Sequence, residues 1–199
     1  DFYPTPSGHV RAGLKLVSEH RAKAILDPGA GTGIWGEYAR QFWPSAWIEG
    51  VEIREVPRYP SYNAWHTGDF LTWKAPRRYD LVIGNPPYAL AEPIVRRSLE
   101  LLSDGGVLIF LLRLSFLEGQ ARAVGLWREF PPRWVAISSK RPSFTNDGRQ
   151  NATAYAFVVW EKGHHGVSEL VWISGSMNPE SLTAPPKRPK RPSRERPAQ

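Results

Sequence analysis

The sequence contains no cysteine among its 199 residues. Disulfide bonds, thiolate catalysis and cysteine-ligated zinc sites are therefore excluded together. Five histidines remain, and their spacing does not match a metal-binding motif. His164 and His165 are adjacent, but the glycines on both sides favour an exposed turn for that pair. We therefore expect no metal site in this protein.

Long apolar runs are also absent. No stretch reaches the roughly 18 apolar residues that a membrane-spanning helix needs, and the longest run, residues 107–112, has the length of a strand. The sequence shows no secretory signal, so we expect a cytoplasmic protein without membrane contact. The hydrophobic fraction of 41% and the charged fraction of 23% are those of an ordinary globular domain with a buried core.

The net charge of +7 is concentrated near the C-terminus. Glu195 is the one acidic residue in a stretch that carries six basic ones, Lys187, Arg188, Lys190, Arg191, Arg194 and Arg196. Repeated basic-proline units at this density cannot bury a core. We therefore predict one domain over residues 1–174 and a disordered basic tail over 175–199. The surplus of positive charge favours a polyanionic partner such as nucleic acid, although the predicted domain itself is only mildly basic.

Short apolar segments alternate with amphipathic ones through the rest of the chain. Strands are expected at residues 24–27, 47–52, 63–66, 79–84, 107–112, 134–138 and 152–160, with 170–173 as a candidate eighth. Helices are expected at residues 34–42, 93–102 and 120–130 and after Ser7. This alternation predicts a Rossmann-like α/β fold with a seven-stranded, mostly parallel sheet and an antiparallel C-terminal edge. Ligands of such sheets bind at the carboxyl ends of the strands.

A glycine-rich turn follows the first expected strand and opens the first crossover helix. It begins at Asp27 and contains Gly29, Gly31 and Gly33, which allow positive φ and a close approach of the backbone to a ligand. No Lys-Ser or Lys-Thr follows, so the turn is not a phosphate-binding nucleotide loop. Glu52 ends the second strand, where a carboxylate can accept both hydroxyls of a ribose. Together these residues indicate a nucleoside site.

Three further residues lie at neighbouring strand ends. Ile53 can lie against the face of a nucleoside base, and Asp69 can accept a hydrogen bond from its exocyclic amine. Phe70 can stack on a purine. We therefore add Ile53, Asp69 and Phe70 to the candidate nucleoside-binding residues.

Asn85, Pro86, Pro87 and Tyr88 follow the apolar strand at residues 79–84. The two prolines stiffen the backbone and remove two N–H donors, so that mainly acceptors remain. The Asn85 side-chain oxygen and the main-chain carbonyls beside the Tyr88 ring suit a planar amino group such as that of adenine.

The glycine-rich turn together with Asn85-Pro86-Pro87-Tyr88 resembles the class I S-adenosylmethionine-dependent methyltransferases that modify planar amino nitrogens. The resemblance covers roughly residues 1–162. It implies S-adenosylmethionine as the cofactor. It also implies that Asn85 contacts the cofactor and accepts hydrogen bonds from the target amine, so that Asn85 is both a catalytic and a cofactor-binding residue. DNA and ribosomal RNA adenine methyltransferases and protein glutamine methyltransferases share this pattern.

Two flanking segments resemble DNA N6-adenine methyltransferases with the γ order of motifs. Tyr3 and Thr5 match the segment that lines the methionine end of the cofactor. Phe144 matches the aromatic residue that stacks on the extruded base, and Lys140 and Arg141 beside it can hold phosphates. The resemblance therefore implies methyl transfer to adenine N6 in DNA, after the base has been flipped out of the duplex.

The γ-order enzymes usually carry a large target-recognition domain after this motif, and here about 37 residues remain. The chain is similar to short forms carried by phages and prophages. Recognition is therefore expected to be limited, or to come from a partner or a second copy of the chain. DNA is the preferred substrate over RNA. An RNA adenine methyltransferase, a protein glutamine methyltransferase and a catalytically silent nucleic-acid-binding subunit stay open as alternatives.

Overall fold

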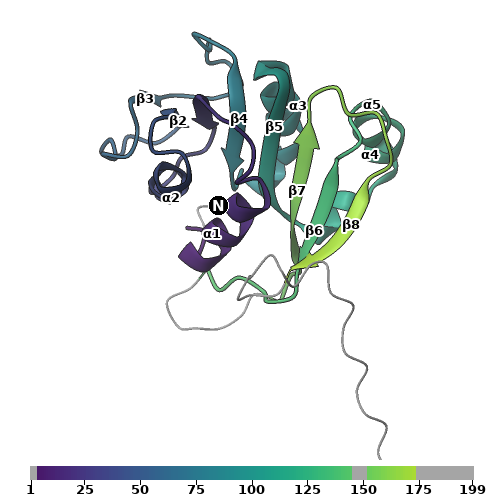
Figure 1. The fold of residues 1–199 in the computed structure, drawn as a ribbon. Coiled ribbons are helices and arrows are strands. Elements are labelled where there is room, and N and C mark those ends of the chain that lie inside the picture. The colour runs from purple at the N-terminus through teal and green to yellow at the C-terminus, as the bar shows by residue number, and fades with distance from the viewer. Residues whose placement is uncertain (1–3, 145–151, 174–199) are drawn as a thin grey trace, which may run out of the picture.

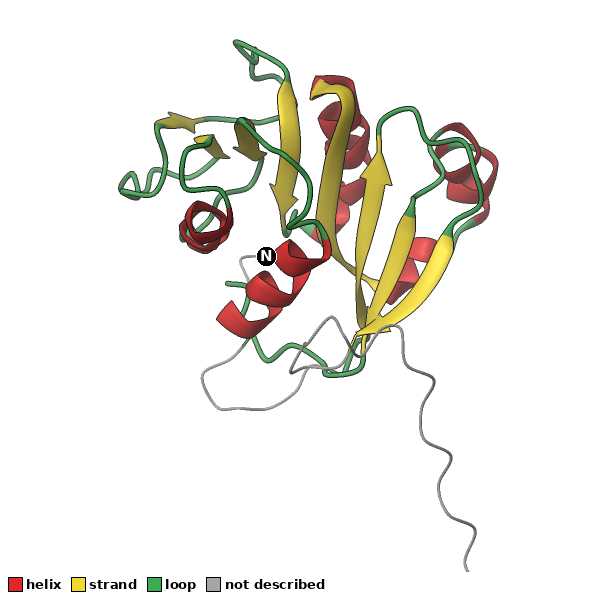
Figure 2. Ribbon diagram, in the orientation of Figure 1, coloured by secondary structure: helices red, strands yellow, loops and turns green. Residues whose placement is uncertain are grey.

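The protein is described from a computed structural model, which covers residues 4–144 and 152–173. Eight strands form one sheet in the order β3-β2-β1-β4-β5-β7-β6-β8, with helices on both faces (Figure 1; Figure 2). The strands are β1 (Ala24–Asp27), β2 (Trp47–Glu52), β3 (Ala64–Thr67), β4 (Tyr79–Gly84), β5 (Leu102–Arg113), β6 (Trp134–Ser138), β7 (Tyr155–Glu161) and β8 (Glu169–Ile173). The expected α/β class with a mostly parallel sheet is therefore confirmed. Tyr3 and the predicted tail lie outside the described residues.

Helices cover the two faces of the sheet and bury two apolar clusters. The helices are α1 (Ser7–Leu16), α2 (Ile34–Phe42), α3 (Ala91–Leu101), α4 (Gln120–Val124) and α5 (Leu126–Glu129), with single 3₁₀ turns η1 (Tyr88–Leu90) and η2 (Leu114–Leu117). Val10 and Leu14 of α1 pack with Trp35 of α2 on one face. Ile94 and Val95 of α3 pack on the opposite face.

The number of strands was predicted one too low, because β8 completes the sheet as its eighth strand. Strand β7 runs antiparallel to β5 and β6, as expected for this edge, but β8 returns parallel to β6. Four of the five residues of β8 are not buried. Its place in the sheet is therefore set by backbone pairing with β6, which leaves only a weak apolar pattern in the sequence.

Two element boundaries differ from the sequence prediction at glycines. Strand β5 begins directly after α3, and its register with β4 shifts between Tyr79 and Leu81, so that Gly105 (φ 70°) lies in a bulge inside the strand. The helix expected at residues 120–130 is divided into α4 and α5 at Gly125, whose φ of −106° and ψ of −93° are not helical. Glycine tolerates both conformations, and the hydrophobic periodicity of the sequence does not reveal them.

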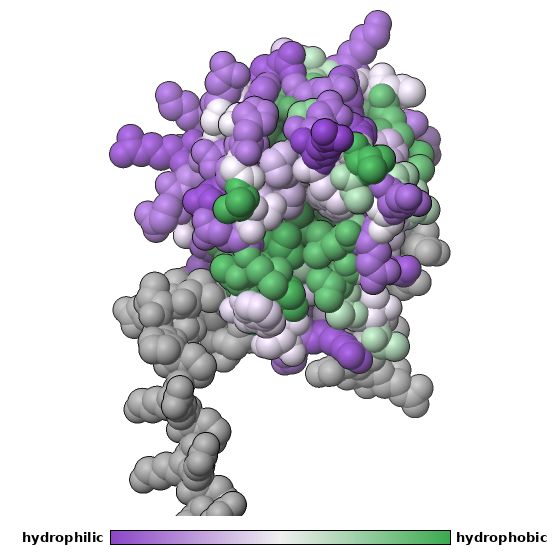
Figure 3. Space-filling view, turned by 90° about the vertical axis from the view of Figure 1, so that its right-hand side faces the viewer, coloured by the Kyte–Doolittle hydropathy of each residue, from purple (hydrophilic) through white to green (hydrophobic). Residues whose placement is uncertain are grey.

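The side of the molecule at β8 exposes apolar side chains. Val167, Leu170 and Trp172 are 83%, 51% and 62% exposed, and Figure 3 shows an apolar area on this side. No helix in the described part of the chain is both long and apolar enough to cross a membrane. Within residues 4–144 and 152–173, no three His, Asp or Glu side chains gather as a metal site.

Candidate active site

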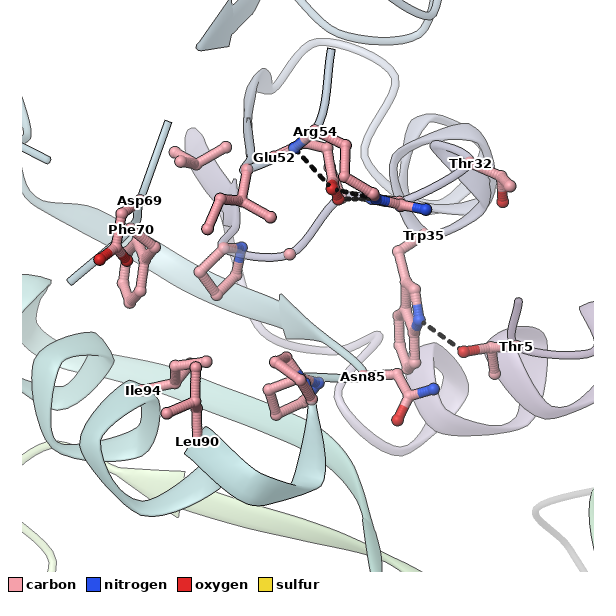
Figure 4. A pocket seen from close by; sticks show the side chains of 18 of the residues that line it. Thr5, Thr32, Trp35, Glu52, Arg54, Asp69, Phe70, Asn85, Leu90 and Ile94 are labelled. Carbon is pink, nitrogen blue, oxygen red and sulfur yellow. Dashed lines mark hydrogen bonds and ion pairs between the residues drawn. The ribbon is translucent and has the colours of Figure 1, made fainter. Parts of the chain in front are cut away.

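A cavity of about 280 Å³ opens at the carboxyl ends of β1, β2 and β4. These ends meet because the three strands are parallel neighbours in the sheet. Four segments supply most of the lining: the glycine-rich turn, residues 51–54, residues 68–70 and residues 85–88. Figure 4 shows Glu52 and Arg54 on one wall and Asn85 on another, near Trp35 and Thr5. The chain segments that were singled out separately in the sequence therefore surround one cavity.

The glycine-rich turn uses its glycines in different ways. Gly31 and Gly33 adopt positive φ values of 56° and 75°, and a Cβ atom on Gly33 would lie 2.5 Å from the Tyr59 ring. Positive φ favours glycine at both positions, and at Gly33 a side chain would also collide with Tyr59. Gly29 lines the cavity with open space beside it, whereas Gly33 is buried at the start of α2 and does not line it.

Asp27 lies beneath this turn and does not line the cavity. Its Oδ2 accepts a hydrogen bond from the Tyr62 hydroxyl at 2.7 Å, and the same hydroxyl accepts the Gly36 N–H at 3.0 Å. Burial raises the pKa of Asp27 to about 7, although the Tyr62 hydrogen bond acts in the opposite direction. Asp27 thus connects the end of β1 to α2 through Tyr62, a residue that sequence reasoning did not select.

Glu52 presents its carboxylate to the glycine-rich turn. Its Oε2 accepts the Gly31 N–H at 2.8 Å, and its Oε1 accepts the N–H and Nε of Arg54 at 3.1 and 2.6 Å. Burial acts to raise the pKa of Glu52, but these hydrogen bonds outweigh it and hold the pKa below its ordinary value. A charged carboxylate therefore stands at the cavity wall. Sequence reasoning did not select Arg54, because its only signal was a cation two positions after Glu52.

The other candidate nucleoside contacts differ in exposure. Ile53 is 68% exposed and lines the cavity mouth. Asp69 is exposed, and its Oδ1 accepts the Leu71 N–H at 2.9 Å. Phe70 also lines the cavity but is only 4% exposed, because its ring packs into the cluster under α3. Phe70 can therefore offer a ligand only a small part of its surface.

Thr5 approaches the cavity from the N-terminal segment. It is 3% exposed, and its Oγ1 accepts a hydrogen bond from the Trp35 indole at 3.2 Å. The interaction joins the segment before α1 to the first turn of α2. Thr5 lines the cavity, and its expected contact with the methionine end of the cofactor stays a prediction.

Residues 85–88 leave β4 at Gly84, which has a φ of 153°. A Cβ atom on Gly84 would lie 3.2 Å from Asp27 Oδ1, so the strand end passes close to the buried carboxyl. Asn85 lines the cavity, Pro86 is buried and Pro87 is exposed. With ψ near 126° at Pro87, the chain then turns into η1.

Tyr88 is half-buried, and its hydroxyl points inward. Burial raises its pKa first, the neighbouring Tyr155 raises it further, and contacts with Asn85 and Arg113 lower it. The Tyr88 ring centroid lies 5.8 Å from that of Tyr155 and 4.4 Å from the Arg113 guanidinium carbon. Sequence reasoning selected neither Tyr155 nor Arg113, because no local motif contains them.

Phe144 also contacts Tyr155 and does not line the cavity. Its ring meets Tyr155 edge to face, with 5.3 Å between centroids. The structure therefore brings Phe144 and Tyr88 to one shared neighbour, although they are far apart in the sequence. Lys140 and Arg141 are exposed beside this segment, and neither lines the cavity.

The sequence relatives and solved structures reported for this chain are named as methyltransferases or as a modification subunit of a restriction enzyme. No family model matches the chain. A type II methyltransferase, M.CvrRI, of Paramecium bursaria Chlorella virus XZ-6E is 41% identical over 68 residues, which are 32% of this chain and 18% of that protein. A tRNA1(Val) (adenine(37)-N6)-methyltransferase of Glaesserella parasuis is 35% identical over 84 residues, 37% of this chain and 36% of that protein. The matched segments thus span well under half of these two relatives.

Solved structures share the fold at low sequence identity. A modification subunit of a putative type I restriction enzyme from Vibrio vulnificus superposes with a TM-score of 0.67 and 14% identity, over 86% of this chain and 46% of that one. A putative class I S-adenosylmethionine-dependent methyltransferase from Listeria monocytogenes gives a TM-score of 0.64 and 15% identity, over 90% of this chain and 68% of that one. The chain therefore has the class I methyltransferase fold.

Proposed function

We propose that this protein is an S-adenosylmethionine-dependent methyltransferase that modifies the N6 amine of adenine in DNA. The observation that carries the proposal is the single cavity shared by the glycine-rich turn, Glu52 and Asn85. Both sequence relatives are named as methyltransferases, one of type II and one acting on adenine N6 in tRNA. Fold alone would not assign a substrate, so the proposal rests on the residues of the site.

The lining of the cavity suits the chemistry of the proposed cofactor. Its volume of about 280 Å³ lies just below the roughly 300–1,000 Å³ found for small-molecule sites. Glu52 offers a carboxylate to ribose hydroxyls, and the turn at Gly29 and Gly31 allows close approach of the backbone. Ile53 and Phe70 supply apolar surface for the adenine ring, with Asp69 as acceptor for its amine. Thr5, with Tyr3 beyond the described residues, is proposed for the methionine end.

Catalysis is proposed to depend on the acceptors at Asn85. When bound, S-adenosylmethionine supplies an electrophilic methyl group on a positively charged sulfur. Asn85 Oδ1 and the Pro86 carbonyl accept hydrogen bonds from the two N–H groups of the target amine, which favours a pyramidal nitrogen with a localised lone pair. As the nitrogen bonds to the methyl carbon, the carbon–sulfur bond would break, the sulfur would leave as a neutral thioether, and the nitrogen would release one proton to solvent. These acceptors also stabilise the positive charge that develops on nitrogen. Pro87 restricts the backbone that holds them, so the alignment of nitrogen with the methyl carbon is fixed before reaction.

The target base is proposed to stack beside Tyr88 after leaving the duplex. Flipping costs a few kcal/mol, and aromatic contacts with Tyr88 and Phe144 offset it by about 1–3 kcal/mol per base. Lys140 and Arg141 are exposed next to Phe144, where they can contact phosphates. A partner or a second copy of the chain is proposed to supply sequence recognition.

Label transfer tests the proposal directly. The protein and S-adenosylmethionine tritiated on the methyl group are incubated with duplex DNA, structured RNA or protein extract in three separate reactions. We expect label in DNA, released on nuclease digestion as N6-methyldeoxyadenosine. An N6-methylated ribonucleoside would instead support the RNA alternative, which the tRNA methyltransferase relative favours. Label in protein alone, or in no acceptor, would contradict the proposal.

A further inference from the structure

Arg113 lies at the end of β5, directly behind the proposed target site. It pairs with Tyr155 across the antiparallel β5–β7 ladder. Directly opposed residues of neighbouring strands point to the same side of a sheet. Both of them contact the Tyr88 ring, Arg113 with its guanidinium carbon 4.4 Å from the ring centroid and Tyr155 with its own ring at 5.8 Å. The ends of β5 and β7 thus support the Tyr88 ring through Arg113 and Tyr155.

The guanidinium of Arg113 differs from the others that lie over aromatic rings. In the part of the chain that the structure describes, the other three such arginines also have an oxygen partner. Arg77 and Arg133 form ion pairs with Glu49 and Glu169, and Arg122 donates to main-chain carbonyls. Arg113 has no carboxylate partner among the described residues, and its buried Nε has no hydrogen-bond acceptor there. Its distance to the ring is also the shortest of the four, 4.4 Å against 4.8–5.4 Å.

A cation placed in this way costs free energy unless another interaction compensates for it. Arg113 is partly buried, and among the described residues the partner found for its guanidinium is the negative face of the Tyr88 ring. A cation–π contact strengthens as the cation loses water. Tyr88 lines the cavity, whereas Arg113 does not. The guanidinium therefore touches the ring from behind and has no surface on the cavity.

We infer that Arg113 is a positioning residue that holds the Tyr88 ring in the orientation in which it receives the target base. The inference rests on the proposed function, because it assigns a nucleobase to the free side of Tyr88. Arg113 acts through Tyr88 and touches neither cofactor nor substrate. Its loss is therefore expected to weaken use of the nucleic acid while cofactor affinity is unchanged.

The ring position can be measured without any nucleic acid. Tyrosines are replaced biosynthetically by 3-fluorotyrosine, and the ¹⁹F resonance of Tyr88 is assigned from its disappearance in Tyr88→Phe. In Arg113→Met, which keeps an unbranched side chain but removes the charge, we expect this resonance to shift or broaden. Arg113→Lys keeps a cation and should restore part of the wild-type shift. Arg133→Met is the matched control, since Arg133 lies over Trp134.

Kinetics on mixed-sequence duplex DNA from a methylation-deficient host complete the test. We expect Arg113→Met to raise KM for DNA about tenfold, equivalent to about 1.4 kcal/mol, with the cofactor Kd unchanged. An unmoved Tyr88 resonance, or an equal change in Arg133→Met, would overturn the inference. If Arg113→Met does not fold, Arg113→Lys and Arg113→Gln decide by the same two readouts. If the wild type methylates no nucleic acid, the proposed function fails, while the ¹⁹F result still decides whether Arg113 holds the ring.

Discussion

The buried carboxyl of Asp27 makes the stability of the protein depend on pH. Asp27 is fully buried, and burial raises its pKa from 3.8 to about 7. Between these two values the folded chain keeps the proton that the unfolded chain has released. The Asp27 proton therefore stabilises the folded chain at the acidic end of this window, and this contribution is lost as the pH rises through about 7. Asp27→Asn removes the ionisation and keeps the shape of the side chain.

The size of the effect follows from these two pKa values. Raising the pH from about 5.5 to about 8.5 deprotonates Asp27 in the folded state, whereas the unfolded state is already charged. Proton linkage then lowers the free energy of unfolding by about 2 kcal/mol over this interval. Asp27→Asn lacks this contribution, although its amide oxygen can still accept the Tyr62 hydroxyl.

Urea unfolding of the cofactor-free protein at both pH values measures the difference. All other ionisable groups are the same in both proteins, so subtracting the variant from the wild type isolates Asp27. We expect the wild type to lose about 2 kcal/mol more than Asp27→Asn between about pH 5.5 and about pH 8.5. Equal losses would mean that Asp27 titrates normally, and the reasoning from burial would then be refuted.

Three further substitutions address the site. Glu52→Gln should raise the cofactor Kd at least about tenfold, since a hydrogen bond to a charged group contributes about 1.5–3 kcal/mol; calorimetric titration measures it, with exposed Glu55→Gln as the control. Asn85→Ala should lower kcat by about 10²–10³-fold, as loss of one polar partner of the transition state does in other enzymes, while cofactor binding survives. Gly36→Ala should destabilise the fold by about 1–3 kcal/mol in thermal unfolding, because its Cβ would lie 2.2 Å from the Tyr62 ring.

Each of these substitutions has an outcome that would contradict its reasoning. Equal cofactor affinity in Glu52→Gln and the wild type would remove Glu52 from the ribose site. Wild-type turnover in Asn85→Ala would show that another group accepts the amine hydrogens. An unchanged Tm in Gly36→Ala would mean that Tyr62 can move away without loss, and the link from Asp27 to α2 would then contribute little.

Part of the site could be predicted because its residues form local motifs. The glycine-rich turn and Asn85-Pro86-Pro87-Tyr88 each follow an apolar strand, and parallel strands bring their carboxyl ends to one edge. The alternation of strands and helices was sufficient to predict this arrangement. The prediction of secondary structure failed where backbone conformation decided it, at the Gly105 bulge and at the Gly125 break. The exposed strand β8 was located only as a candidate, so the predicted strand count stopped at seven.

The tertiary structure alone decided which side chains support these motifs. Tyr62 reaches Asp27 across 35 positions of the chain, and Arg113 and Tyr155 meet Tyr88 only because β4, β5 and β7 are neighbours in the sheet. Such contacts leave no periodicity or spacing in the sequence, since each partner lies on a different element. The sequence by itself therefore determined the fold class and the chemical groups of the site. Contacts between segments far apart in the sequence bury Asp27 against Tyr62, which raises the pKa of its carboxyl, and place Arg113 and Tyr155 against the Tyr88 ring.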